Sequence, residues 1–344
     1  MPTNNNFGIL NTGIIDFAGA TSPGWVSNLG CTLSAGTFTI TDAGGAALSA
    51  TNPGWVTLPS QTAGRLVSIK VTANQDFIDD SGASEIITNI FGVTSGIAWA
   101  DDCPFYIYAV PNDAETAIAF MISRIPHATR SPVQAAIGAP DDAVADDEGD
   151  FFSFDNLDET LYDENPCLCI GSIRMRMTAS DDWTVQTLTD QDGIGRFHFD
   201  TFFTFPLNQN GAEANTYIAA NGGTAPTFGT TQYVYRFSPN GNVEVFADMS
   251  VDSGTDGIGA VESRFSLPVL AGPTGFTELL VNSNAYTETA TGGLRTTSVS
   301  ISNATTYFRL YEADLSTVQN GDFTNGGRQV STHFIYAAVN ASTA

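Results

Sequence analysis

The stretch YVYRFSPNGNVEVFADM, from Tyr233 to Met249, decides the fold class. The aromatic residues at 233, 235 and 237 alternate with Val, Arg and Ser, and after a short break the apolar residues at 243, 245 and 247 alternate with Glu, Phe and Asp. A period of two is typical of a strand with one buried face. Pro239, Asn240 and Gly241 fill the break, and Asn-Gly supplies the positive φ angles of a tight hairpin turn. Because a lone hairpin is unstable, this stretch predicts a larger sheet around it.

The rest of the C-terminal third repeats the same pattern. Residues 208–230 are rich in turn formers, and five further strands are predicted after the hairpin, at 263–270, 277–286, 297–302, 306–313 and 331–339. Short strands separated by turn signals every eight to twelve residues are typical of a sandwich or jelly roll. We therefore predict a jelly-roll-like domain over residues 208–344.

A small N-terminal β module is predicted over residues 1–75. The hexapeptide TSPGWV (21–26) returns as TNPGWV (51–56), and each copy places Pro-Gly in a turn just before an aromatic strand residue. The runs GTFTI (36–40) and GRLVSIKVT (64–72) are read as two strands. The module is thus interpreted as a duplicated strand–turn unit.

The central region, residues 76–207, is predicted to contain two hairpins. The first joins 104–110 to 117–125, although a short helix over 114–124 capped by Asp113 is the alternative. The second joins CLCIGSIRMRMT (167–178) to WTVQTL (183–188), and 197–207 is read as an edge or bridging strand. The sequence as a whole predicts an all-β protein of two or three sandwich or jelly-roll-like domains.

A long acidic loop, residues 126–166, separates the two central hairpins. It has eleven carboxylates and no Lys or Arg between Asp141 and Glu164. Loops of this length are usually functional, mobile or packed on a neighbour. The phenylalanines at 151, 152 and 154 predict that part of the loop docks on an apolar surface.

Charge excludes several classes of function. The chain of 344 residues carries 37 acidic and 12 basic side chains, a net charge of −25, and its one lysine is Lys70. Such a surface repels phosphate backbones and anionic membranes and suits high ionic strength. No apolar stretch approaches the roughly 20 residues of a membrane span. The first residues, MPTNNNFGIL, have no signal-peptide pattern, so secretion by that route is not expected.

The candidate reactive residues all have a simpler structural interpretation. Cys167 and Cys169 would face the same side of a strand, but no second Cys or His pair completes a zinc site, and four cysteines are too few for a disulfide framework. The acidic residues at 141, 142, 146, 147, 148 and 150, and Asp252 with Asp256, lack the spacing of an EF-hand. The histidines at 127, 198 and 333 could belong to a Ser-His-Asp hydrolase site, but the sequence has no GxSxG motif to supply its nucleophile. The two DGIG segments, at 192–195 and 256–259, are read as turns. We predict no catalytic, cofactor-binding or metal-binding residues.

Two aromatic residues of the terminal domain, Tyr286 and Phe323, are candidates for stacking on sugars, with core or trimer contacts as the alternative. Asn303 and Asn340 lie in glycosylation sequons, which carry weight only in a secreted protein.

The C-terminal third resembles the jelly-roll heads that end many bacteriophage tail-fibre proteins. The resemblance lies in the YVYRF strand, the Asn-Gly turn, the NVEVFADM strand, the SRFSLPV segment and the STHFIYAAV strand. The central segments 104–126 and 165–188 also resemble a region of predicted phage virion proteins from environmental sequences. This resemblance implies a homotrimeric appendage that adsorbs to a host-surface molecule. The chain departs from long fibres in having no heptad coiled coil and no collagen-like repeat.

From these observations we expect a non-enzymatic tail-fibre or spike subunit of a phage particle, made in the host cytoplasm and exposed on the virion. Its expected partners are itself, as a homotrimer, proteins of the phage tail, baseplate or capsid, and a host-surface glycan or protein. Neither nucleic acid nor membrane insertion is expected. The alternatives are a capsid decoration or head-fibre protein without a receptor role and, further off, a glycan-cleaving tailspike or a secreted lectin-like adhesin.

Overall fold

The protein is all-β, as the sequence predicts. The computed structural model describes residues 25–34, 37–62, 64–77, 99–123, 126, 151–153, 165–177, 183–185, 188–189, 192–204, 218–219, 227–239, 241–253, 263–268, 271, 278–288, 294–302, 307–311 and 328–337. These residues form strands and turns and no helix. Within them, no helix is long and apolar enough to cross a membrane.

The N-terminal module consists of two three-stranded antiparallel sheets. One has the order β1 (Val26–Ser27), β4 (Gly54–Pro59), β5 (Leu66–Val71), and the other β2 (Gly30–Ser34), β3 (Thr37–Thr41), β6 (Gln75–Phe77). The two predicted strands correspond to β3 and β5. The last residues of the two hexapeptides pair with each other, because Val26 of β1 lies opposite Val56 of β4 in an antiparallel register. The two copies have different environments, since Trp25 is buried and Trp55 is exposed.

The central region forms a six-stranded sheet. Its order is β11 (Trp183–Val185), β10 (Leu168–Met177), β7 (Trp99–Pro111), β8 (Ile118–Ser123), β9 (Phe151–Ser153), and β12 (Gly193–Ile194) also pairs with β10. Both predicted hairpins are confirmed: β7 pairs with β8 and β10 with β11. Residues 118–123 are a strand, so the alternative helix over 114–124 is wrong. Phe105 to Val110 are buried on both faces of β7, which explains their continuous apolar run.

The C-terminal region forms one antiparallel nine-stranded sheet. Its order is β13 (Phe203–Thr204), β15 (Thr227–Phe237), β16 (Asn242–Ser253), β21 (Arg328–Ala337), β18 (Glu278–Glu288), β19 (Leu294–Ser302), β20 (Tyr307–Tyr311), β17 (Ser263–Ser266), β14 (Ile218–Ala219). Every predicted strand of this region is present. Of the expected strand at 197–207, residues 203 and 204 form β13, which pairs with β15, residues 197–202 are not a strand, and residues 205–207 lie outside the described part of the structure.

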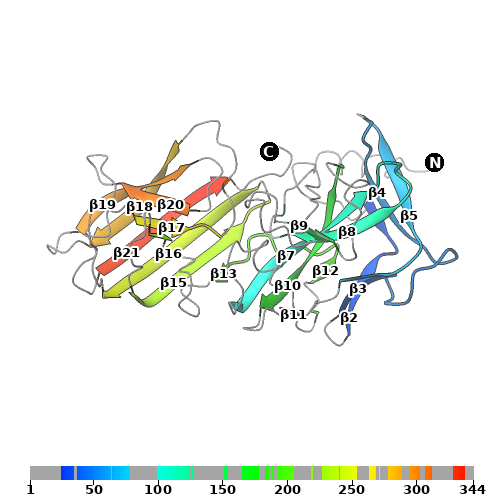
Figure 1. Cartoon of the computed structure of the whole chain (residues 1–344), viewed down its shortest axis with the longest axis horizontal. Helices are drawn as coiled ribbons and strands as arrows, with labels where there is room; N and C mark the ends of the chain where they lie inside the picture. Colours follow the sequence, from blue (N-terminus) through cyan, green and yellow to red (C-terminus); the bar gives the residue numbers. More distant parts are fainter. Residues whose placement is uncertain are drawn as a thin grey trace, which may run out of the picture.

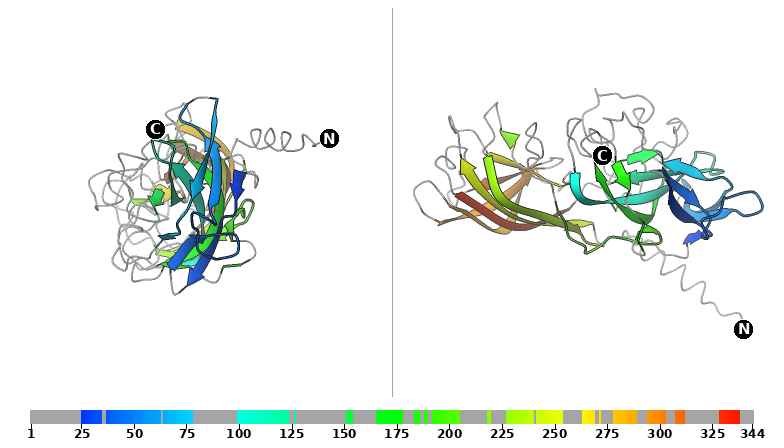
Figure 2. Two further views of the ribbon diagram at one scale, coloured as in Figure 1. Left: turned by 90° about the vertical axis from the view of Figure 1, so that its right-hand side faces the viewer. Right: turned by 90° about the horizontal axis from the view of Figure 1, so that it is seen from below.

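The organising hairpin is confirmed and closes at Ser238–Gly241. Gly241 has φ +87°, and its N–H donates to the Ser238 carbonyl at 3.1 Å. On the inner face, the Phe308 ring of β20 lies 4.8 Å from the Phe334 ring of β21, although β18 and β19 separate these strands in the sheet. The sheet therefore curls over itself, as its curved profile shows (Figure 2). The described strands of the C-terminal region belong to one continuous sheet, so a sandwich of two sheets in this region stays a prediction.

The three regions lie in a row along the longest axis of the molecule (Figure 1). One set of buried, mutually packed hydrophobic side chains extends from Leu29 in the N-terminal module to Tyr336 in the C-terminal sheet. At the first junction, Gln75 donates to the Ile118 carbonyl at 2.7 Å and accepts from the Phe120 N–H at 3.1 Å. The N-terminal module thus continues directly into the central sheet.

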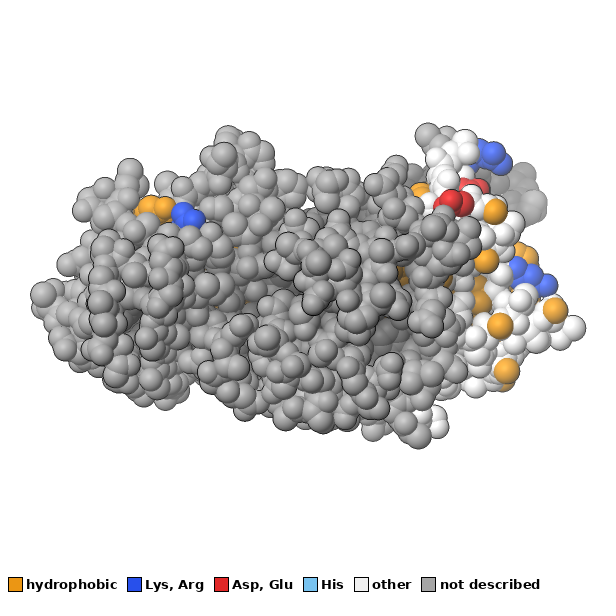
Figure 3. Space-filling model, viewed as in Figure 1, with side chains coloured by type: hydrophobic (Ala, Val, Ile, Leu, Met, Phe, Trp, Pro, Cys, Tyr) orange, Lys and Arg blue, Asp and Glu red, His pale blue; other side chains and the backbone are white. Residues whose placement is uncertain are grey.

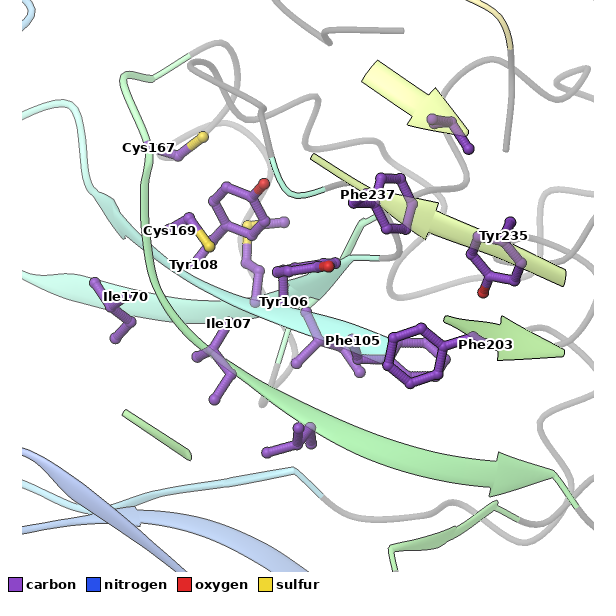
Figure 4. Close-up of a cluster of buried hydrophobic side chains, with 14 of the residues drawn as sticks. Phe105, Tyr106, Ile107, Tyr108, Cys167, Cys169, Ile170, Phe203, Tyr235 and Phe237 are labelled. Carbon is purple, nitrogen blue, oxygen red and sulfur yellow. The ribbon is translucent and has the colours of Figure 1, made fainter. Parts of the chain in front are cut away.

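The second junction is made by residues 192–204, which we call the connector. Tyr106 of β7 stacks on Phe199 of the connector, meets Phe237 of β15 edge-on at 5.7 Å, and donates its hydroxyl to the His198 carbonyl at 2.9 Å. Figure 4 shows Tyr106 directed at Phe237, with Phe203 and Tyr235 beside them. One aromatic cluster therefore joins the central sheet, the connector and the C-terminal sheet.

Candidate functional site

An exposed cluster of aromatic and charged side chains lies on the outer face of the C-terminal sheet. Strand alternation turns Tyr235, Val245 and Phe334 into the core and their neighbours outward. The outward residues of β15, β16 and β21, joined by Phe202 of the connector, form what we call the outer cluster: Phe202, Arg236, Glu244, Phe246, His333 and Ile335.

Strand register brings these side chains together from distant parts of the sequence. Arg236 lies directly opposite Glu244 across β15 and β16, and Phe246 lies opposite His333 across β16 and β21. Phe202 reaches the same face because the two-residue strand β13 pairs with β15 beside it. The cluster thus depends on strand pairings that bring together residues 202, 236 and 333, which are far apart in the sequence.

The contacts among five of these side chains form a closed circuit. The Glu244 carboxylate accepts a hydrogen bond from Arg236 and lies 2.8 Å from His333 Nε2. The His333 ring stacks on Phe246 at a centroid distance of 4.0 Å, and Phe246 meets the Phe202 ring at 5.5 Å. The Arg236 guanidinium, 4.6 Å from the Phe202 ring centre, completes the circuit. Each side chain is held by two others, which orders the surface before anything binds to it.

Partial burial alone would raise the pKa of Glu244, but its hydrogen bonds to His333 and Arg236 outweigh this effect and lower the pKa below its usual value. Glu244 is therefore a carboxylate at neutral pH and offsets the charge of Arg236. The outer cluster presents little net charge on a chain whose net charge is −25.

The apolar members of the cluster face solvent. Phe202 is 45% exposed, Phe246 37% and Ile335 48%, which makes them three of the five exposed large hydrophobic residues in the described part of the chain. The other two, Trp55 and Leu66, lie in the N-terminal module. A preordered apolar surface with its charges already paired is suited to binding an apolar or flat partner surface.

A second constellation lies buried at the connector, and its composition resembles a Ser-His-Asp triad. His198 Nε2 lies 2.5 Å from Asp192 Oδ1, and both side chains are almost fully buried. Ser172, however, donates its hydroxyl to the Arg196 carbonyl at 3.2 Å and accepts from the His198 backbone N–H at 2.9 Å. Its oxygen is engaged with the backbone and not with the imidazole, so the geometry lacks the nucleophile–base contact of a triad.

Asp192 instead links the connector to the central sheet. Arg174 of β10 donates to both of its carboxylate oxygens at 3.1 Å, and the Thr189 hydroxyl donates at 2.7 Å. Desolvation alone would raise the pKa of Asp192, but the hydrogen bonds from His198, Arg174 and Thr189 lower it far below its usual value. The connector is therefore anchored by a carboxylate that is ionised at neutral pH and accepts several hydrogen bonds.

The described thiols are unsuited to chemistry: Cys167 and Cys169 are buried and Cys31 is half-buried. Burial raises the pKa of Cys31 to about 11 and that of Cys169 to about 12, and it raises the pKa of Cys167 as well. Among the residues that the structure describes, no three His, Cys, Asp or Glu side chains gather in a group able to hold a metal ion.

Several residues singled out in the sequence have side chains outside the described part of the structure. They are Cys103, His127, the acidic residues at 141–150, the phenylalanines at 151, 152 and 154, Asp252, Asp256, Tyr286, Asn303, Phe323 and Asn340. Most of the acidic loop 126–166 also falls outside it, so the predictions about these positions stay predictions.

Sequence reasoning missed the outer cluster. It placed His198 and His333 in strands beside aromatic residues. This is correct for His333, which lies in β21, and wrong for His198, which lies in the connector between β12 and β13. The alternation of the hairpin did put Arg236, Glu244 and Phe246 on one face. The pairing of β16 with β21 and the position of Phe202 had no signal in the sequence, because they depend on long-range strand order.

Comparisons with known proteins gave no relatives: no family model, no curated protein and no solved structure matches this chain.

Proposed function

We propose that this protein is a structural subunit of a bacteriophage particle, a tail-fibre or spike protein that assembles as a homotrimer. In this proposal the N-terminal module attaches to the particle, and the C-terminal domain contacts a glycan or protein on the host surface. The proposal combines the sequence resemblance to phage appendages with an all-β chain whose three regions lie in a row (Figure 1). It assigns no catalytic step to the chain.

The observation that carries the binding role is the outer cluster. Phe202, Phe246 and Ile335 expose apolar surface on an ordered sheet, and the paired charges of Arg236, Glu244 and His333 hold them in place. Aromatic residues, phenylalanine among them, and arginine are enriched at protein interfaces. Three copies in a trimer would present three such surfaces, so that individually weak contacts add up to avid binding.

The buried polar groups of the described structure support a scaffold role. Ser172, Asp192 and His198 all bond to one another, to Arg174 or to the backbone, and so serve to fix the connector. The thiols of Cys31, Cys167 and Cys169 have raised pKa values. These groups are used for structure, which favours a protein that works by presenting surfaces.

The test is binding of the purified full-length chain to host cells and to a glycan array. We expect saturable binding, and we expect the double variant Phe246→Ala/Ile335→Ser to weaken it at least about tenfold, the factor that corresponds to about 1.4 kcal/mol. Thr62→Ala, an exposed substitution in the turn between β4 and β5 of the N-terminal module, serves as the control and should leave binding unchanged.

Two results would overturn parts of the proposal. If virions adsorb to the host and the full-length chain binds neither cells nor glycans, the receptor role is wrong, and antibody labelling of the particle would then show whether the protein decorates the capsid. Release of reducing sugar from host polysaccharide would assign a glycan-cleaving activity instead.

A further inference from the structure

The outer face of the β1–β4–β5 sheet is the second place where the described structure exposes large hydrophobic side chains. Trp55 and Leu66 are each 41% exposed, while Val56 of β4 and Ile69 of β5, on the opposite face of the sheet, are buried in the core. Between them the hydroxyls of Thr57 and Ser68 lie 2.8 Å apart across β4 and β5. These hydroxyls bond to each other, so this part of the face makes few demands for hydrogen bonds from a partner.

Lys70 lies on this face beside Trp55. The two residues are direct cross-strand partners in β4 and β5, and both are exposed. The Lys70 ammonium donates to the Ala50 carbonyl at 2.9 Å, which holds the charge at the margin of the face. Figure 3 shows orange hydrophobic and blue cationic side chains at the end of the molecule that carries β4 and β5.

Charge distinguishes this module from the remainder of the chain. Residues 25–77 contain two carboxylates, Asp42 and Asp76, and two cations, Arg65 and Lys70, so they contribute nothing to the net charge of −25. The Asp42 carboxylate is occupied by the N–H groups of Gly44 and Ala46 and by Asn52, and Asp76 belongs to β6 in the other sheet. In the described strands β1, β4 and β5, no residue is acidic.

At the end of this face nearest Leu66, an acidic residue of the central region lies against the N-terminal module. Glu115 accepts hydrogen bonds from the Ser60 hydroxyl at 2.6 Å and from the Gln61 N–H at 2.7 Å. Lys70, at the opposite end of β5, therefore carries the cationic character of the face.

We infer that this face is an interface between copies of the chain, in which Trp55 and Lys70 of one protomer contact an acidic flank of the next. The inference rests on the homotrimer of the proposed function. A cyclic trimer is built from heterologous contacts, so each protomer must offer two unlike, complementary surfaces. An apolar face with a lysine, on a chain that is otherwise strongly acidic, supplies one of the two, and the carboxylate-rich remainder supplies the other.

The described structure offers exposed carboxylates for the second surface. Asp113, Asp200 and Asp248 lie in the central region, the connector and the C-terminal sheet, and all three are exposed. Association through Trp55 buries the largest exposed ring of the module, the residue type most enriched in interface hot spots. The Lys70 charge adds orientation, since arrangements that place a carboxylate opposite it are favoured over those that bury the ammonium unpaired.

Because Lys70 is the one lysine in the sequence, a carbodiimide cross-linker tests this contact directly. The reagent joins an amine to a carboxylate without a spacer, so the only amines available are Lys70 Nζ and the N-terminal α-amine. An equal mixture of ¹⁵N-labelled and unlabelled full-length chain should give mixed-isotope peptides that join Lys70 to an Asp or Glu of residues 99–344. Lys70→Arg should lose these peptides while keeping the solution mass of the wild type.

Matched variants test the energetic role of the face. We expect the wild-type chain to have about three times its monomer mass of 36.3 kDa by analytical ultracentrifugation. Trp55→Ser/Lys70→Glu should raise the concentration at which trimers dissociate at least tenfold. Arg196→Glu makes the same change of charge at an exposed residue of the connector and should leave the mass unchanged.

The possible failures are distinct. A trimer that contains no intermolecular Lys70 peptides and is insensitive to Trp55→Ser/Lys70→Glu would overturn this interface and leave the proposed function intact. A chain that stays monomeric at all concentrations would overturn the interface and the trimer together, whereas host binding by the outer cluster is measured separately on cells.

Discussion

At the scale of single residues, the Asp192 side chain anchors the connector to the central sheet. It accepts hydrogen bonds from Arg174 and Thr189, and it lies against the His198 ring. Its side chain is only 4% exposed, so a change at this position leaves buried donors without an acceptor.

Asp192→Asn should lower the free energy of unfolding by about 2 kcal/mol, because hydrogen bonds to a charged group contribute about 1.5–3 kcal/mol. Urea denaturation at pH 7 measures this loss. Asp200→Asn is the control: Asp200 is exposed, and its backbone N–H bond to the Phe237 carbonyl does not involve the side chain.

The difference in unfolding free energy between the wild type and Asp192→Asn depends on pH, and the direction follows from the lowered pKa of Asp192. The pKa of Asp192 in the folded protein lies below the unfolded value of about 3.9. Its stabilising effect is therefore complete above that value and is lost as the pH falls through the folded pKa. The difference in unfolding free energy between wild type and Asp192→Asn should be full at about pH 5 and shrink below about pH 4. A difference that grows on acidification would contradict this account.

At the scale of secondary-structure elements, the hairpin of β15 and β16 is set by its turn. Gly241 adopts φ +87°, a conformation that costs a residue with a Cβ atom roughly 1–2 kcal/mol. Pro239 precedes it in the same turn, where its fixed φ suits the first half of the bend.

Gly241→Ala should therefore destabilise the protein by about 1 kcal/mol without changing its fold. The measurement is the urea midpoint together with the far-ultraviolet circular dichroism spectrum. Gly44→Ala is the matched control, because Gly44 lies in another exposed turn, has no positive φ and has room for a methyl group. Equal losses in the two variants would show that the positive φ of Gly241 is not the cause.

Strand positions could be predicted from the sequence because their signals are local. Alternation around Tyr235 and Val245, and the Pro-Gly turns before Trp25 and Trp55, depend on neighbouring residues alone. The positions of three features could not. The insertion of β21 between β16 and β18, the pairing of β13 with β15, and the assembly of the outer cluster all depend on which distant strands pair.

Burial on both faces of a strand was the other reason why the sequence did not fully predict the structure. The residues from Phe105 to Val110 do not alternate in character, so their sequence left a short helix over 114–124 as an alternative next to them. The central sheet is covered on both faces at β7, and a doubly buried strand has no polar side to reveal its period.

At the scale of the whole molecule, the junction between the central and C-terminal sheets is packed and hydrogen-bonded on both sides. The connector donates from Gly195 to the Ile170 carbonyl at 2.7 Å and from Asp200 to the Phe237 carbonyl at 2.8 Å. Tyr106 contacts both the connector and β15. The two sheets are therefore expected to move as one body.

Tyr106→Ala should loosen this junction, because it removes a fully buried ring and the hydroxyl bond to His198. Amide hydrogen exchange at residues 195–200 should become faster by at least about tenfold, which corresponds to about 1.4 kcal/mol of local opening free energy. Phe308→Ala is the comparison, since Phe308 is equally buried but contacts Phe265 and Phe334 within the C-terminal sheet. If both variants accelerate exchange in the connector equally, Tyr106 does not hold the junction.

The position of β21 has a consequence for biosynthesis. It is the most C-terminal of the described strands, yet it lies between β16 and β18 in the middle of the sheet. While the ribosome is still making the polypeptide, β16 and β18 each have an unsatisfied edge until residues 328–337 emerge from the exit tunnel. Nascent chains that stall before residues 328–337 are made would expose two strand edges with unpaired backbone N–H and C=O groups. Neighbouring nascent chains on the same messenger RNA could then pair through these edges and aggregate.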